Sequence, residues 1–225
     1  MVLDDPNNKN ALSKDMMSEL KKLLIKASSD DSIKVIIIAA VGDVFCSGHN
    51  LKDITEARKN EDEGRAYFLD LFNLCSSLMQ MIVNFPKPVI AEIDGIATAA
   101  GCQLVASCDL AIASDSSKFA TPGVNIGLFC STPMVALSRN VSKKDAMKML
   151  LTGDMIDAAE AKRISLINDH VPEENLYVEI MSLASQISTK SLATIKVGKE
   201  AFYRQNEMTL SDAYNYTSHV IVGIR

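Results

Sequence analysis

The sequence contains no tryptophan, and aromatic residues occupy only 5% of its 225 positions. A core built without them must rely on aliphatic side chains and on the 11 methionines, which adapt to irregular gaps. Basic blocks are also absent and the formal net charge is −5, which argues against a nucleic-acid-binding surface. We see no apolar run of the length that crosses a bilayer, so we expect no membrane span.

Paired cysteines are absent too. An odd number of unpaired cysteines favours a reducing compartment with free thiols. With only three histidines, none near a cysteine pair, we expect neither a metal site nor a bound cofactor. The five scattered cysteines are Cys46, Cys75, Cys102, Cys108 and Cys130.

Strand and helix patterns alternate over the first two thirds of the chain. Residues 35–40 (VIIIAA) predict a strand buried on both faces, and residues 67–85 predict a long amphipathic helix. Helical patterns alone fill the last third, at residues 173–188, 191–204 and 209–221. This order indicates an α/β fold with right-handed crossovers.

The stretch 88–114 is the centre of the pattern. A strand at residues 88–93 ends at Asp94-Gly95, and small residues then open a short helix near Ala99, Ala100 and Gly101. A second bend of this kind follows Cys46, at Ser47, Gly48 and His49. Each bend offers free backbone N–H groups suited to an anion or a polarised carbonyl. The alternative is that these residues are small only because a helix packs closely on a sheet.

The order of short motifs resembles the crotonase, or enoyl-CoA hydratase/isomerase, superfamily. Two runs, 97–109 and 119–125, resemble one group within it. The matching motifs cover nearly the whole chain: 10–12, 35–38, 45–48, Leu51, 87–90, Gly95, 99–104, 108–109, 119–122, Gly127 and 151–153.

This resemblance implies a crotonase-like spiral of ββα repeats with a helical C-terminal region. The expected division is a spiral core at residues 1–170 and a helical trimerisation region at 171–225, assembled as a trimer or hexamer. Family members continue past the position of Arg225 and begin before Met1, so we expect either that both ends are shortened here or that the pocket is completed differently. The expected ligand is an acyl-CoA thioester, with coenzyme A entering only as part of it.

The resemblance also assigns site residues. The backbone N–H groups of His49 and Ala100 would form an oxyanion hole around the thioester oxygen. The His49 side chain is not required for this, although it is a weak candidate for a general base. Residues expected to contact the acyl-CoA are Ser47, Gly48, Asn50, Leu51, Lys52, Ala99, Gly101, Thr121 and Asn125.

Two carboxylates that hydratases of the family use are missing. Their positions carry Gln103 and Gly123. An amide orients water but cannot take its proton near neutral pH, and glycine contributes no group. We therefore expect a hydratase-like, acyl-CoA-binding protein of fatty-acid metabolism with weak or no hydration.

Two other functions stay open from the sequence. One is an active crotonase-family isomerase, thioesterase or decarboxylase that uses another base. The other is a structural or interaction protein that keeps only the fold. The expected location is the mitochondrial matrix, or otherwise the cytoplasm, and no targeting segment is visible in this chain.

Overall fold

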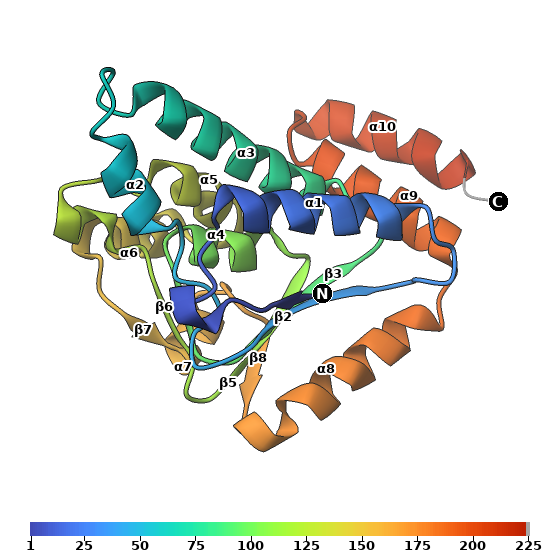
Figure 1. The fold of residues 1–225 in the computed structure, drawn as a ribbon. Coiled ribbons are helices and arrows are strands. Elements are labelled where there is room, and N and C mark those ends of the chain that lie inside the picture. Colours follow the sequence, from blue (N-terminus) through green and yellow to red (C-terminus); the bar gives the residue numbers. More distant parts are fainter. Residues whose placement is uncertain (224–225) are drawn as a thin grey trace.

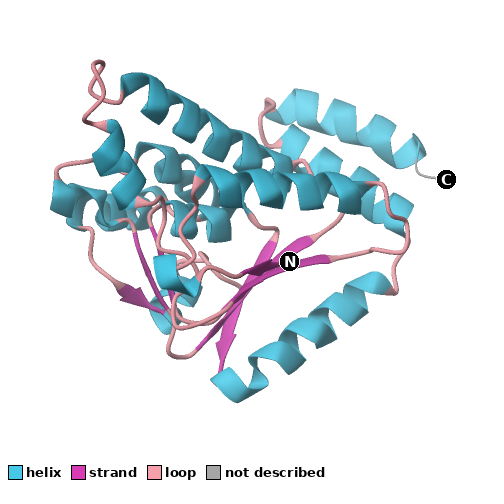
Figure 2. Cartoon of the chain, in the orientation of Figure 1, coloured by secondary structure: helices cyan, strands magenta, loops and turns pink. Residues whose placement is uncertain are grey.

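The computed structural model describes residues 1–223. A parallel five-stranded sheet in the order β1-β2-β3-β5-β8 lies between layers of helices (Figures 1 and 2). Its strands are β1 (Val2–Leu3), β2 (Ile36–Ala40), β3 (Val89–Ile93), β5 (Leu110–Ser114) and β8 (Asp169–Val171). The predicted α/β class is therefore confirmed.

A second, smaller sheet carries the strands that lead into the site. In it β4 (Ile96–Thr98) pairs in parallel with β6 (Lys118–Ala120), and β6 pairs antiparallel with β7 (Ile156–Asp157). The pattern did not predict β4 or β7, because a strand of two or three residues has no readable period.

Helices connect these strands and cover both faces of the larger sheet. Ser13, Ser142 and Asp157 cap α1, α6 and α7 by accepting hydrogen bonds from first-turn N–H groups, as serine and aspartate commonly do at a helix N-terminus. The helices are α1 (Lys14–Ser28), α2 (Leu51–Ala57), α3 (Arg65–Val83), α4 (Ala100–Ser107), α5 (Ser131–Asn140), α6 (Lys143–Thr152), α7 (Ala158–Arg163), α8 (Glu173–Ser188), α9 (Leu192–Gln205) and α10 (Leu210–Gly223), with 3-10 turns η1 (Pro6–Asn8) and η2 (Pro122–Ile126).

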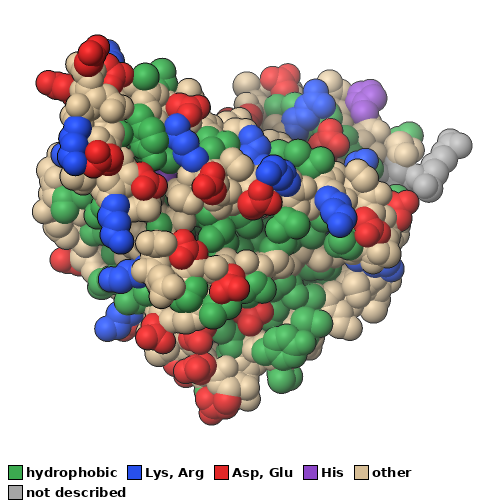
Figure 3. Space-filling view, viewed as in Figure 1, with side chains coloured by type: hydrophobic (Ala, Val, Ile, Leu, Met, Phe, Trp, Pro, Cys, Tyr) green, Lys and Arg blue, Asp and Glu red, His purple; other side chains and the backbone are tan. Residues whose placement is uncertain are grey.

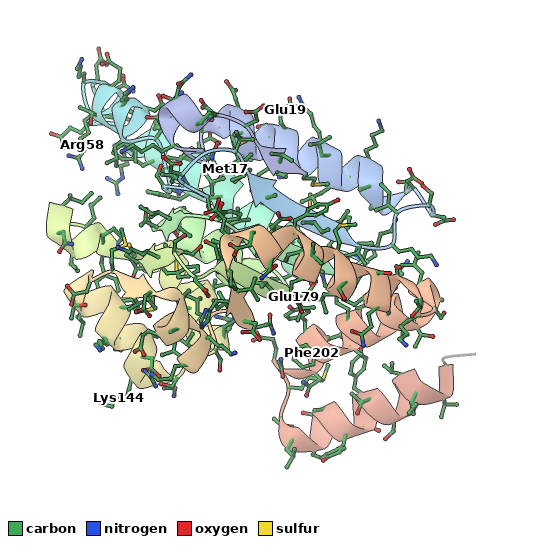
Figure 4. All side chains as sticks on the ribbon, turned by 90° about the horizontal axis from the view of Figure 1, so that it is seen from below. Met17, Glu19, Arg58, Lys144, Glu179 and Phe202 are labelled. Carbon is green, nitrogen blue, oxygen red and sulfur yellow. The ribbon has the colours of Figure 1, made fainter. Side chains whose placement is uncertain are left out.

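The two faces of the sheet differ. Helix α8 covers one face, where Leu176 and Ile180 pack with Ile90 and Ile112. It lies nearest the viewer in Figure 4, with the exposed Glu179 labelled on it. The opposite face packs against the main core under α1, α3 and α4. On β2 the expected burial on both faces is only partly right, because Ile37 on the α8 face stays half-buried.

The described helix α3 is long and apolar enough to cross a membrane by length and composition, with a mean hydropathy of 1.3. The expectation that no apolar run reaches this length was therefore too strong. Core helices can have the same length and hydropathy, and α3 buries Leu71, Cys75 and Leu78 against the protein. The length and composition of α3 are therefore only weak evidence for a membrane span.

Charge is unevenly distributed on the surface. Figure 3 shows acidic side chains gathered at the lower tip of the molecule, near the junction of β8 and α8, with hydrophobic side chains across the middle of the same face. No broad basic area is visible on this face, in line with the net charge of −5.

Candidate functional site

The two predicted bends lie side by side. Cys46 forms a parallel bridge with Ala97: its N–H donates to Ile96 O at 3.1 Å, and Thr98 N–H donates to Cys46 O at 2.9 Å. Just beyond the bridge, Thr98 Oγ1 donates to Ser47 O at 3.0 Å. Segments 50 residues apart in sequence therefore bend away from the smaller sheet at the same point.

Close contact explains why both bends consist of small residues. A Cβ on Gly48 would lie 3.0 Å from Ala99 Cβ and 3.2 Å from Ala100 N, and its φ of +92° also favours glycine. A Cβ on Gly101 would lie only 2.1 Å from Cys46 O. Close packing accounts for glycine at both positions and is compatible with a binding role, so the alternative that Ala99, Ala100 and Gly101 are small only for packing stays open.

Ala99 holds the second bend in a strained conformation. Its φ of +50° and ψ of −117° are sparsely populated by residues with a Cβ. Its N–H donates to Ala120 O at 2.9 Å, and its carbonyl accepts from Gln103 N–H at 3.0 Å. This geometry turns the chain from β4 into α4 within one residue and begins the helix at Ala100.

Within residues 1–223, neither the His49 N–H nor the Ala100 N–H has a hydrogen-bond acceptor in the protein. Ala100 N is at the start of α4, where first-turn N–H groups have no partner inside the helix. His49 N follows Gly48, which lies against Ala100 N. Such a pair of donors has the chemistry to hold a developing oxyanion. Their role as an oxyanion hole stays a prediction.

The first bend is fixed from the N-terminal side. Leu12 N–H donates to Gly48 O at 2.7 Å, and Ser47 N–H donates to Lys9 O at 3.1 Å. The fully buried Asn10 side chain donates to Val41 O and Val44 O at 2.9 and 2.7 Å. Asn10 and Leu12 were known only as motif residues from the sequence, and their supporting role follows from these contacts.

The His49 imidazole faces α3. Its Nδ1 lies 3.1 Å from Leu12 O, and its ring packs edge-on against Phe72 with centroids 5.5 Å apart. Burial lowers the pKa of His49 below its ordinary value of 6.5. Its Nε2 is buried and has no partner within the described residues.

The two positions of the missing carboxylates have different surroundings. Gln103 is buried on α4, and its Oε1 lies 3.9 Å from the Cys75 thiol of α3. A Cβ on Gly123 would lie 2.9 Å from Cys130 Sγ, so a longer side chain would have to displace this thiol. Thr121, two residues earlier, is fully buried with an unpartnered Oγ1.

The other predicted contact residues are distributed around this centre. Asn50 caps α2 by accepting the Lys52 N–H at 2.9 Å, and Leu51 and Lys52 are exposed beside it. Asn125 is exposed and its amide donates to Gly153 O at 3.5 Å, at the end of α6. The structure thus gathers Ser47, Gly48, Ala99, Gly101 and Thr121 near the bends and places Asn125 against a separate helix end.

Three carboxylates near the bends in sequence are directed elsewhere. Glu92 lies on β3 two residues after Ile90, and therefore on the α8 face. Asp109 accepts from Lys199 Nζ at 2.6 Å and from Tyr203 OH at 2.9 Å. Asp115 lies 2.5 Å from His170 Nδ1.

The thiols are poor nucleophiles at neutral pH. All five cysteines are free and buried. Desolvation raises the pKa of Cys46, Cys75 and Cys102 to about 12, so these groups stay protonated. Within the described residues, no group of three or more histidine, cysteine or acidic side chains is arranged to hold a metal.

Comparison with known proteins decides the family. The sequence model described as enoyl-CoA hydratase/isomerase matches residues 1–222. The chain belongs to the enoyl-CoA hydratase/isomerase family. The resemblance seen in the motifs is confirmed.

Similar members of the enoyl-CoA hydratase/isomerase family include enoyl-CoA hydratase domain-containing protein 3, mitochondrial. The Xenopus laevis protein is 50% identical over 99% of this chain and 74% of its own length. The human protein is 48% identical over 99% of this chain and 72% of its own length. This is the group that the runs 97–109 and 119–125 resembled.

Solved structures agree with the fold. The crystal structure of human enoyl Coenzyme A hydratase domain-containing protein 3 has a TM-score of 0.93 and 48% identity, covering 99% of this chain and 86% of that one. An enoyl-CoA hydratase from Mycobacterium smegmatis has a TM-score of 0.93 and 42% identity, covering 98% and 84%. The predicted crotonase-like fold is therefore confirmed.

Proposed function

We propose that this protein binds acyl-CoA thioesters and grips the thioester oxygen with the N–H groups of His49 and Ala100. The observation that supports the proposal is the contact between the two bends, each of which leaves an N–H without a protein acceptor. A preorganised pair of donors stabilises an enolate oxygen by roughly 3–4 kcal/mol per donor.

Weak or absent hydration is part of the same proposal. Gln103 and Gly123 stand where hydratases of the family have two carboxylates, and a Cβ on Gly123 would lie 2.9 Å from Cys130 Sγ. With no carboxylate at either position to take a proton from water, crotonyl-CoA should turn over well below about 1 per second, the low end of ordinary enzymes.

The remaining expectations come from family membership. The relatives named above are called mitochondrial, which supports a mitochondrial location. The proposed role in fatty-acid metabolism follows from the proposed acyl-CoA ligand. Asn50, Leu51 and Lys52 lie at the surface after the first bend, where they would meet the CoA part of the ligand. We propose assembly as a trimer or hexamer through the C-terminal region 171–225, of which residues 224 and 225 lie outside the described residues, with residues 1–170 as the spiral core.

The test compares acetyl-CoA with S-ethyl-CoA, a thioether without the carbonyl oxygen. Two hydrogen bonds to the oxygen predict about 10-fold tighter binding of the thioester by calorimetry, with free CoA as the baseline. Absence of binding by all three ligands would contradict the proposal and support the purely structural alternative. Equal binding of thioester and thioether would contradict the proposed hydrogen bonds to the thioester oxygen, but it would leave the proposed acyl-CoA binding intact.

A second candidate function is an active isomerase, thioesterase or decarboxylase of this family that uses another base. Within residues 1–223, His49 Nε2 has no hydrogen-bond partner, which favours this candidate because Nε2 is a basic atom of the residue that supplies one of the two proposed donors. A panel of CoA esters followed by mass spectrometry separates this candidate from a protein that only binds.

A further inference from the structure

Two buried polar side-chain atoms have no hydrogen-bond partner within residues 1–223, His49 Nε2 and Thr121 Oγ1. Both belong to segments that form the site. His49 is in the first bend, and Thr121 follows Ala120, whose carbonyl accepts from Ala99 N–H in the second. Buried polar groups are normally satisfied, so unpartnered ones mark a place where a ligand or water completes the bonding.

The hydrogen bond at Nδ1 fixes the state of the His49 ring. Leu12 O, 3.1 Å away, can only accept, so Nδ1 must carry a proton. Nε2 of the neutral ring then carries a lone pair and can only accept. Burial favours this neutral form at pH 7, because it lowers the pKa of His49.

Helix α3 relates this ring to Gln103. The His49 ring packs on Phe72, and Gln103 Oε1 faces Cys75 Sγ. Phe72 and Cys75 are three residues apart, so they lie on one face of α3, about one turn from each other. The imidazole and the Gln103 amide therefore pack against neighbouring positions on one face of α3.

We propose that His49 Nε2 is the proton acceptor of this site, acting on the carbon next to the thioester carbonyl of a bound acyl-CoA. The C–H bond breaks, the proton moves to Nε2, and its electron pair forms an enolate whose oxygen is held by the His49 and Ala100 N–H groups. The proton on Nε2 is replaced by a deuteron from D2O, and transfer of this deuteron to the α carbon restores the thioester, so the exchange needs only solvent water as co-reactant. One residue thus supplies a backbone donor and a side-chain base.

This inference rests on the proposed acyl-CoA binding and adds the chemistry of the same site. The ligands it predicts are acyl-CoA thioesters that carry a hydrogen on the α carbon. Phe72 packs on the imidazole and is 37% exposed, so the part of α3 that contacts the His49 ring reaches the surface.

The experiment measures α-hydrogen exchange of butyryl-CoA in D2O by mass spectrometry. The wild-type protein is expected to incorporate deuterium faster than buffer. His49→Gln keeps the backbone N–H, so it should retain butyryl-CoA binding in calorimetry while losing exchange about 100-fold or more, the range of a general base. His170→Gln, a histidine held by Asp115, is the matched control and should exchange as the wild type does.

The outcomes separate the two proposals. Absence of butyryl-CoA binding by the wild type overturns the proposed function. Binding without exchange, or exchange that persists in His49→Gln, overturns the role of His49 and leaves binding intact. If His49→Gln does not fold, His49→Phe keeps an aromatic ring against Phe72 and gives the same two readouts.

Discussion

Gly101 has no Cβ, and this allows α4 to lie directly against the backbone of Cys46. Gly101→Ala would place Cβ 2.1 Å from Cys46 O, a backbone atom of the bridge that joins the bends. We expect a loss of about 1–3 kcal/mol in the free energy of unfolding, measured with urea, because overpacking exceeds the gain in helix propensity.

The matched control for Gly101→Ala is Gly198→Ala on α9, where an added Cβ meets nothing within 4 Å. This change should stabilise the protein by about 0.5–1 kcal/mol, as alanine does in an open helical position. Equal effects of the two substitutions would contradict the close contact at Gly101.

His49 predicts a pH dependence of stability. Its folded pKa lies below the ordinary 6.5, so its contribution is fully present above pH 6.5 and is lost as pH falls from there through the folded pKa. The free energy of unfolding of the wild type should therefore fall more between pH 7.5 and 5.5 than that of His49→Gln. Parallel urea curves at both pH values would contradict a buried neutral imidazole.

At the scale of elements, the longer helices and capping residues were predictable because their signals are local. The helix 173–188 was predicted with the bounds of α8, and Gly153 ends α6 with a φ of +66°. The sequence pattern predicts the last strand at residues 166–171, which is too long, since only Asp169–Val171 pair with β5. Pairing with a distant strand decides such ends, and the local sequence does not encode it.

Helix α9 is attached to the core by a buried ion pair. Lys199 Nζ donates to Asp109 Oδ2 at 2.6 Å, and the Lys199 side chain is only 8% exposed. Lys199→Ala should cost about 3 kcal/mol of unfolding free energy in thermal or urea unfolding, because it leaves Asp109 without its cation. Lys196→Ala, at an exposed position of the same helix, should change stability by less than about 0.5 kcal/mol.

At the scale of the whole molecule, the proposed assembly depends on apolar surface that one chain leaves open. On α10, Leu210, Tyr214 and Ile221 are 76%, 70% and 72% exposed and recur at helical spacing. Light scattering should show a trimer or hexamer. The double substitution Leu210→Lys and Tyr214→Lys should shift the oligomer toward monomer, because two lysine charges would have to be buried in the interface.

The control for the assembly prediction is Ile25→Lys on α1, an apolar residue 58% exposed outside the C-terminal helices. It should leave the oligomeric state unchanged. A monomeric wild-type protein would contradict the assembly, and dissociation by the control alone would move the interface to α1.

The sequence by itself determined the α/β class, the family and the two small-residue bends, because periodicity, caps and ordered motifs are properties of the chain. Tertiary structure decided the rest. The Cys46–Ala97 bridge brings the two bends together. The Leu12 carbonyl defines the His49 tautomer, and α3 supplies the aromatic neighbour of its ring. The alternation of side chains along β3 turns Glu92 toward α8. These features depend on contacts between residues far apart in sequence, which no local pattern records.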